Sequence, residues 1–180
     1  MAAADELKNA GFSWIGLEVV YHHAKALRSL TIGDVERLGA GMASWGEVDA
    51  FGAYIAGPTW LHGQISDANV RRWTKSRDRW WRRAALVGAT VLNTKAKGGR
   101  GDAARTLDVA ARLCRDPDDM VIKALSWSLR SLVPWDRPAV ERFLTDHDHV
   151  LSARVKREVR NKLRTGLKNP SRAPRASPRH

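Results

Sequence analysis

Trp45 and Asp49 are the two residues whose types and spacing most directly suggest chemistry in this chain. On a helix, residues four apart lie on the same face. An indole ring attracts positive charge to its face and a carboxylate pairs with it directly, so the two side chains could hold a cation between them. The alternative is a core tryptophan next to an exposed or capping aspartate, and the pair alone is compatible with both.

Tryptophan is unusually frequent here, with eight residues against three phenylalanines and two tyrosines. Trp73, Trp80 and Trp81 lie within a basic stretch. Indoles can pack in a core, stack on bases or hold arginines that face phosphates, so this interleaving favours a nucleic-acid surface. We still expect most of the eight in the core.

The net charge of +12 is concentrated in two stretches. Residues 71–83 contribute +6 and residues 154–180 contribute +9, which leaves −3 for the rest. A concentrated positive potential attracts a polyanion through counterion release, which makes nucleic acid the leading partner. The alternative is that these stretches are solvated helix faces and a disordered tail.

Several other classes of protein are disfavoured. The chain has no nucleotide-binding glycine loop and no metal-like spacing among its six histidines, so we expect neither a cofactor nor a metal. It has no apolar run long enough for a membrane span and no secretory signal, so we expect a cytoplasmic protein. We also expect a monomer. The single cysteine, Cys114, excludes an internal disulfide and falls on the apolar stripe of an expected helix. We expect it to pack in the core.

The elements that must position these residues are helices, because glycine and proline separate stretches of helical periodicity and strand-like alternation is nearly absent. Ser44 and Glu47 have capping-box spacing, which starts a helix at Trp45 that we expect to end before Gly57. Further helices are expected over 13–30 and 34–42. Three more begin after cap residues: one after Ser66 to about residue 75, one after Asp78 to about 94 and one after Asp102 to about 115. The last three are expected from Asp118 or Asp119 to about 133, after Asp136 through Phe143, and from Ser152 to Gly166.

Related tryptophan-containing segments recur at intervals of about forty residues, the period of two-helix HEAT-type repeats. Such repeats stack into an α-solenoid with a concave groove, lined here by basic residues and suited to a duplex. Arg82 and Arg83 fall on adjacent helix faces, and we expect Arg83 to face the groove. The repeat domain is expected to cover residues 1–167, and the proline- and arginine-rich segment 168–180 to be a disordered basic tail.

Four linked motifs resemble the AlkD-type DNA alkylation repair family: Trp45-x-x-Val-Asp49, Trp81-x-Arg83-Ala-Ala, Lys123-Ala-x-x-Trp127-x-Leu-Arg130 and Lys156-Arg-Glu158. The resemblance implies a monofunctional, HEAT-like repeat glycosylase that excises cationic N3- and N7-alkylated purines from double-stranded DNA, with which it would associate in the nucleoid. The implied catalytic residues are Asp49, Trp45 and Trp127. The DNA-binding residues are expected to be Arg83, Arg82, Arg130, Lys156 and Arg157, with Arg83 holding a phosphate.

The segment before Trp45 is shorter than the resemblance implies, because the family is expected to have further helices there. Those helices would help to surround the DNA, so we expect part of this DNA-binding surface to be missing. One alternative function is a non-catalytic HEAT-like module that binds distorted or branched DNA through the same groove. Another is a protein-interaction scaffold, against which the basic stretches count.

Overall fold

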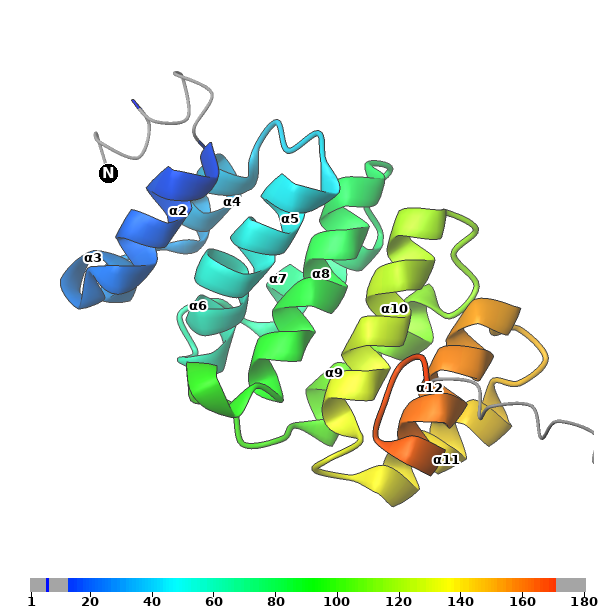
Figure 1. Cartoon of the computed structure of the whole chain (residues 1–180). Helices are drawn as coiled ribbons and strands as arrows, with labels where there is room; N and C mark the ends of the chain where they lie inside the picture. The colour runs from blue at the N-terminus through cyan, green and yellow to red at the C-terminus, as the bar shows by residue number, and fades with distance from the viewer. Residues whose placement is uncertain (1–5, 7–12, 171–180) are drawn as a thin grey trace, which may run out of the picture.

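The computed structural model describes residue 6 and residues 13–170, and within them it contains helices and turns but no strand (Figure 1). The all-helical prediction is therefore confirmed. The helices are α2 (Ser13–His22), α3 (Ala24–Arg28), α4 (Ile32–Gly39), α5 (Trp45–Phe51), the π-helical η1 (Gly52–Ala56), α6 (Gly57–Leu61), α7 (Asp67–Thr74), α8 (Arg79–Leu92), the 3-10 helix η2 (Lys95–Lys97), α9 (Ala103–Leu113), α10 (Asp119–Leu132), α11 (Arg137–Asp146) and α12 (Ala153–Thr165).

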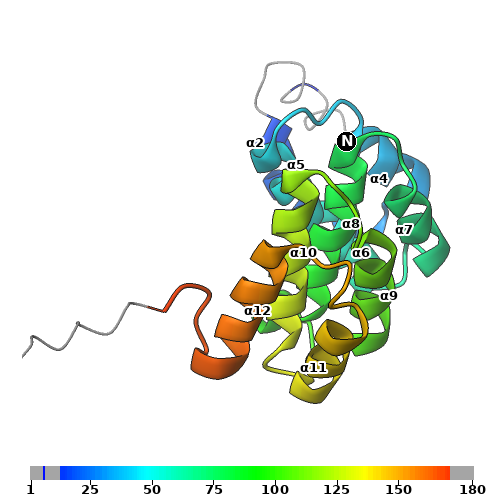
Figure 2. The ribbon, with the colours of Figure 1, turned by 90° about the vertical axis from the view of Figure 1, so that its right-hand side faces the viewer.

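The helices form two layers, which Figure 2 shows from the side. One layer holds α5 with η1 and α6, then α8, α10 and α12, and the other holds α4, α7, α9 and α11. Within the first layer each helix contacts the next in sequence order, and α7 contacts α9 in the second. This arrangement of successive helix pairs is consistent with a helical-repeat solenoid.

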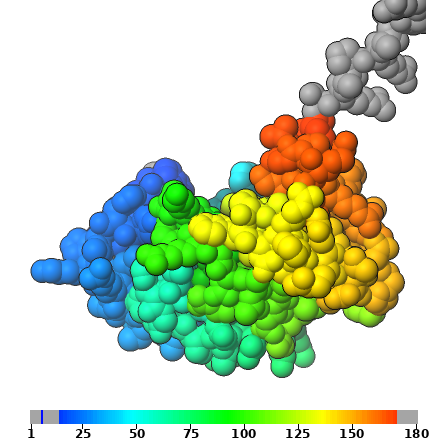
Figure 3. All heavy atoms as spheres, turned by 90° about the horizontal axis from the view of Figure 1, so that it is seen from below, coloured from blue at the N-terminus to red at the C-terminus, as the bar shows by residue number. Residues whose placement is uncertain are grey.

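The face formed by α5, α8, α10 and α12 is hollowed between the N-terminal helices and α12, as Figure 3 shows from below. The core lies between the layers and includes the fully buried residues Phe51, Ile55, Leu86, Leu125 and Leu129. Cys114 is buried, and burial raises the pKa of its thiol, as suits a residue that packs in a core.

Capping residues define the helix starts that the sequence predicts. The Ser44 hydroxyl accepts from the Glu47 N–H, and the Glu47 carboxylate accepts from the Ser44 N–H at 3.0 Å. The side chains of Ser66, Asp78, Asp102, Asp118, Asp136 and Ser152 cap α7, α8, α9, α10, α11 and α12. Trp45 is therefore fixed in the first turn of its helix.

The predicted end of this helix before Gly57 is wrong. The chain continues through η1 into α6, and the Gly57 N–H donates to the Gly52 carbonyl five residues earlier. A wider π turn places residues five apart on one side, so Gly52 and Gly57 both face α8. A Cβ atom on Gly52 would meet Val87 at 2.5 Å, and one on Gly57 would meet Val91 at 2.4 Å. The two glycines allow α8 to pack against this helical run at close range.

The N-terminal helices also differ from the prediction. The helix expected over 13–30 is broken at His23, whose Nδ1 accepts from the Ala26 N–H at 3.1 Å and caps α3. The next helix begins at Ile32 rather than Asp34, because Thr31 and Asp34 form a capping box. In both places a side chain satisfies a free backbone N–H and so sets where the helix starts.

Candidate active site

Asp49 and Arg83 form the central contact of the site. The Arg83 Nε and Nη2 donate to the Asp49 Oδ1 and Oδ2, each at 2.9 Å, and Nη1 donates to the Met120 carbonyl oxygen at 2.5 Å. Arg83 is 5% exposed, whereas the Asp49 side chain keeps 23% of its surface. A bidentate arginine contact fixes the orientation of a carboxylate and stabilises its negative charge. Arg83 therefore joins α5, α8 and α10 and holds Asp49 in place.

Trp45 lies one turn before Asp49 and is 62% exposed, whereas Trp60 and Trp73 are nearly completely buried. An exposed indole leaves a large apolar surface in water, which is unusual for a residue held so firmly by its helix cap. It is therefore free to contact a ligand that also reaches the Asp49 carboxylate.

Trp127 is half-buried on α10 and packs against the core. It lies seven residues after Met120, or about 10 Å farther along the helix axis. The structure thus brings Asp49 and Arg83 into contact and places Trp127 on the next helix of the same layer.

Arg82 points away from this contact. Its Nε donates to the Asp116 Oδ2 at 2.6 Å, and its Nη1 donates to the carbonyls of Ser76 and Arg77, each at 3.0 Å. The adjacent arginines therefore have different partners, as their positions on the helix require.

Arg130 and Arg157 surround a buried acid. Glu158 is 3% exposed and accepts a hydrogen bond from Ser126 at 2.7 Å, and the guanidiniums of Arg130 and Arg157 each lie 4.0 Å from its carboxylate. Lys168 lies 3.6 Å from the same carboxylate. Burial lowers the pKa of Arg130, and Glu158 opposes this effect. One carboxylate thus organises several cations, a role that the sequence motif containing Glu158 did not reveal.

Lys156 lies on the same helix as Arg157 but contacts another acid. Its Nζ donates to the Asp148 carbonyl at 3.0 Å and lies 3.3 Å from the Asp148 carboxylate. Arg157 is the more accessible of the two, with 63% of its side chain exposed.

The basic stretch 71–83 is largely paired with acids from neighbouring elements. The pairs are Arg71 with Asp108, Arg72 with Glu36, Arg79 with Asp118, Arg82 with Asp116 and Arg83 with Asp49. The positive charge counted along this stretch is therefore largely balanced in the folded chain. For this stretch, ion-paired helix faces describe the structure better than one continuous basic stripe.

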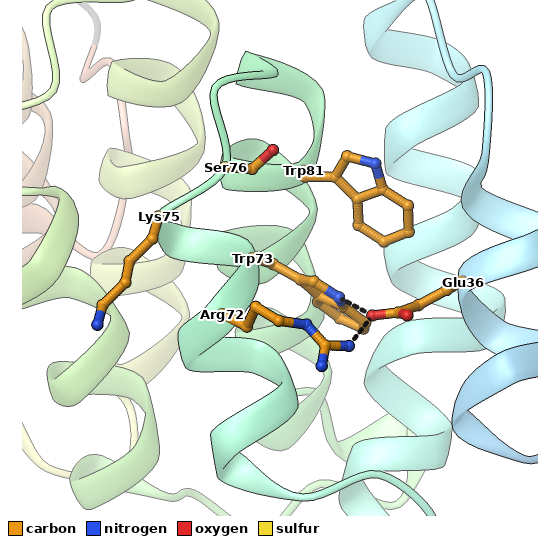
Figure 4. Close-up of a pocket in the computed structure, with 6 residues that line it drawn as sticks. All are labelled: Glu36, Arg72, Trp73, Lys75, Ser76 and Trp81. Carbon is orange, nitrogen blue, oxygen red and sulfur yellow. Dashed lines mark hydrogen bonds and ion pairs between the residues drawn. The ribbon is translucent and has the colours of Figure 1, made fainter.

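A separate cavity of about 450 Å³ lies between α4 and α7, with Trp81 of α8 forming one wall (Figure 4). The Trp73 Nε1 donates to the Glu36 Oε1 at 2.9 Å, and Arg72 contacts the same oxygen. Trp73 therefore serves to join two helices. It is 4% exposed, as is expected of a core indole.

The fold and site define an all-helical protein in which a fixed carboxylate lies one helical turn from an exposed indole. Residues 8–163 match the family model described as DNA alkylation repair enzyme, and the chain belongs to this family. This assigns the protein to the repair of alkylated DNA and confirms the resemblance seen in its motifs. No curated protein and no solved structure matches the chain significantly. Among the described helices, none combines the length and apolar character that a membrane span needs.

Proposed function

We propose that the protein is a DNA glycosylase that excises cationic N3- and N7-alkylated purines and leaves an abasic site. The observation that carries this proposal is the Asp49 carboxylate, held by two hydrogen bonds from the buried Arg83 while part of its surface stays open. A positioned anion is what stabilisation of a cationic sugar requires.

The chemistry needs little from the protein beyond this charge. As the bond between C1′ and the base nitrogen breaks, its electron pair leaves with the alkylated base, which is neutralised, and the sugar becomes oxocarbenium-like. Water then attacks C1′ and gives up a proton, and we propose that the Asp49 carboxylate accepts it. The alkylated base already carries positive charge, so a strong general acid is not required.

The two indoles contribute through their faces. Trp45 is exposed one turn from Asp49, so its ring can stabilise the positive charge of the sugar or the lesion. Trp127 is proposed to act in the same way from α10. Arg83 is proposed to be a positioning residue, because its donors contact Asp49 and Met120.

DNA binding is proposed to use the cations at the C-terminal end of the hollowed face. Arg157 is exposed, and Arg130 and Lys156 lie beside it with partial exposure. They would contact backbone phosphates and place the protein on the duplex as a monomer. Arg82 is left out of this proposal because its guanidinium already donates hydrogen bonds to Asp116 and to the Ser76 carbonyl.

The test is release of 7-methylguanine from methylated duplex DNA, measured under single-turnover conditions with excess enzyme. Asp49→Asn should lower the rate by roughly a hundredfold to a thousandfold, the usual effect of losing one stabilising group. Its affinity for DNA should stay equal or rise slightly, since a negative charge near phosphates is removed.

Asp116→Asn is the matched control, because Asp116 also pairs with an arginine of α8 but lies away from Asp49. It should excise at the wild-type rate. Equal rates for wild type and Asp49→Asn would contradict the catalytic assignment. Tight binding without any base release by the wild type would instead support a non-catalytic DNA-binding module.

A further inference from the structure

A small cavity of about 180 Å³ lies between α3, α6 and η2. Three of its lining residues carry or can carry positive charge: Arg28, His62 and Lys97. No acid lines it. This composition differs from that of the stretch 71–83, where most arginines are paired with a carboxylate.

Lys97 is the central cation of this cavity. Its Nζ lies 4.3 Å from the ring centroid of Tyr21 and 4.4 Å from that of Tyr54. Its backbone N–H donates to the Thr94 carbonyl, but within the described part of the chain its Nζ makes no hydrogen bond or ion pair with a protein acceptor. Burial lowers the pKa of Lys97, and Glu18 opposes this effect from α2. Two aromatic faces stabilise an ammonium electrostatically, but they do not offer its three N–H groups a conventional hydrogen-bond acceptor.

Arg28 and His62 complete the group. Arg28 is exposed on α3, and its guanidinium has no ion pair within the residues that the structure describes. His62 follows α6, where its backbone N–H donates to the Pro58 and Trp60 carbonyls, and the residue lines the cavity. Three donor-bearing side chains from three separate elements thus converge on one space.

The turn that carries Lys97 is held rigidly. Gly98 closes η2 with a φ of +85°, and the Gly99 N–H donates to the Thr94 carbonyl at 3.1 Å. The Trp135 indole donates to the Asn93 carbonyl at 2.8 Å just before the turn. A cation presented by a fixed backbone loses less conformational entropy when it binds an anion.

The cavity also has a defined place relative to Asp49. Tyr54, which Lys97 contacts, lies five residues after Asp49 in the same helical run, or about 8 Å along its axis. Trp45 lies in the opposite direction along that run. One helical turn of duplex spans about 34 Å, so a single duplex is long enough to contact both Asp49 and the cavity.

We propose that Arg28, His62 and Lys97 form a phosphate-binding pocket that holds a DNA backbone phosphate within one helical turn of the nucleotide at Asp49. The position of that nucleotide rests on the proposed function, whereas the phosphate contact does not require excision. The pocket would hold the duplex on the side of Asp49 that is opposite to Trp45 along the helical run.

The test measures affinity for an unmodified duplex over a range of salt concentrations by fluorescence anisotropy. Lys97→Met keeps the aliphatic stem between the two tyrosine rings and removes the charge. It should weaken binding at low salt by about tenfold and reduce the slope of log K against log salt by about 0.9, the value for one phosphate. Lys95→Met is the matched control, because Lys95 is exposed on the same short helix and does not line the cavity.

Equal effects of Lys97→Met and Lys95→Met, or a wild-type slope for Lys97→Met, would overturn the proposal. Arg28→Met provides a second test at an exposed site if Lys97→Met lowers the melting temperature. Titration with inorganic phosphate distinguishes the source of the anion: phosphate binding that is lost in Lys97→Met, with an unchanged DNA slope, would mark a site for free phosphate and would also overturn it.

A scan with single methylphosphonate linkages then locates the contact on a duplex with a tetrahydrofuran abasic analogue. One neutralised linkage, within one helical turn of the analogue, should weaken binding by wild type but not by Lys97→Met. The salt slope is independent of base release. Loss of excision in the methylguanine assay with a normal Lys97 effect would therefore reject the proposed function and keep the pocket.

Discussion

Arg83 shows how one buried side chain changes the interpretation of its neighbours. An exposed arginine in this position would be available to a phosphate, as the motif predicts. In the structure its guanidinium contacts Asp49 and the Met120 carbonyl, and only 5% of the residue is exposed. A buried guanidinium needs such partners, because an unpaired buried charge is strongly unfavourable. The phosphate contact of Arg83 stays a prediction, and its proposed role here is to position Asp49.

Replacing Arg83 by methionine should therefore affect stability more than DNA electrostatics. The free energy of unfolding should fall by about 3 kcal/mol, because the change breaks a largely buried ion pair. Urea denaturation measures this loss, and the salt slope of DNA binding should stay at the wild-type value. Arg157→Met, at an exposed arginine, should show the reverse: normal stability and a slope reduced by about 0.9. A normal stability and a reduced slope for Arg83→Met would restore the predicted phosphate contact.

At the scale of elements, the helical run from α5 through η1 to α6 carries two of the three candidate catalytic residues, Trp45 and Asp49. Its first turn is fixed by the Ser44 capping box, and its middle is pressed against α8 through Gly52 and Gly57. The same approach brings Arg83 of α8 within hydrogen-bond distance of Asp49. The spacing between these two helices is therefore part of the site geometry.

Gly57→Ala should destabilise the protein by roughly 3 kcal/mol, because the new methyl group would meet Val91 at 2.4 Å in a packed core. Excision should also slow, since α5 and α8 would be forced apart. Gly46→Ala is the control on α5: its added methyl group meets no atom within 4 Å, and alanine favours the helix by about 0.5–1 kcal/mol. Chemical denaturation of both variants measures the difference, and equal stabilities would disprove close packing at Gly57.

At the scale of the whole molecule, many ion pairs connect neighbouring helices. Glu36 of α4 binds Arg72 and Trp73 of α7, and Asp108 of α9 binds Arg71 of α7. Burial raises the pKa of Glu36, but its hydrogen bonds with Trp73 and Arg72 outweigh this effect and lower that pKa. The same balance, with Arg112 and Arg71 as donors, lowers the pKa of Asp108.

These shifts predict acid sensitivity. A carboxyl group with a lowered pKa contributes stability that is fully present above its unfolded pKa and is lost as the pH falls through its folded pKa. The melting temperature should therefore be nearly constant above about pH 5 and should decrease between about pH 5 and pH 3. Glu36→Gln should melt lower at neutral pH and lose less on acidification. If Glu36→Gln showed the full wild-type decrease, the contact between Glu36 and Arg72 would not contribute to acid sensitivity.

The sequence by itself determined the fold class, the family and most helix boundaries. These features depend on local chemistry: a side chain such as Ser44, Asp78 or Ser152 caps the helix that directly follows it, and proline and glycine interrupt apolar periodicity. The boundaries that failed involve less common devices. The histidine cap at His23 and the π turn before Gly57 depend on backbone geometry that residue types alone do not specify.

Only the tertiary structure decided which charges are free. Arg83 directly follows Arg82 in the sequence, and Lys97 lies two residues after Lys95. In the structure Arg83 meets a carboxylate 34 residues away, whereas Lys97 meets two tyrosine rings and an open cavity. The outcome depends on which distant helix packs against each side chain, and a count of charges along the chain contains no such information. Ion pairing between helices is long-range in sequence and short-range in space, so it becomes visible only once the layers are assembled.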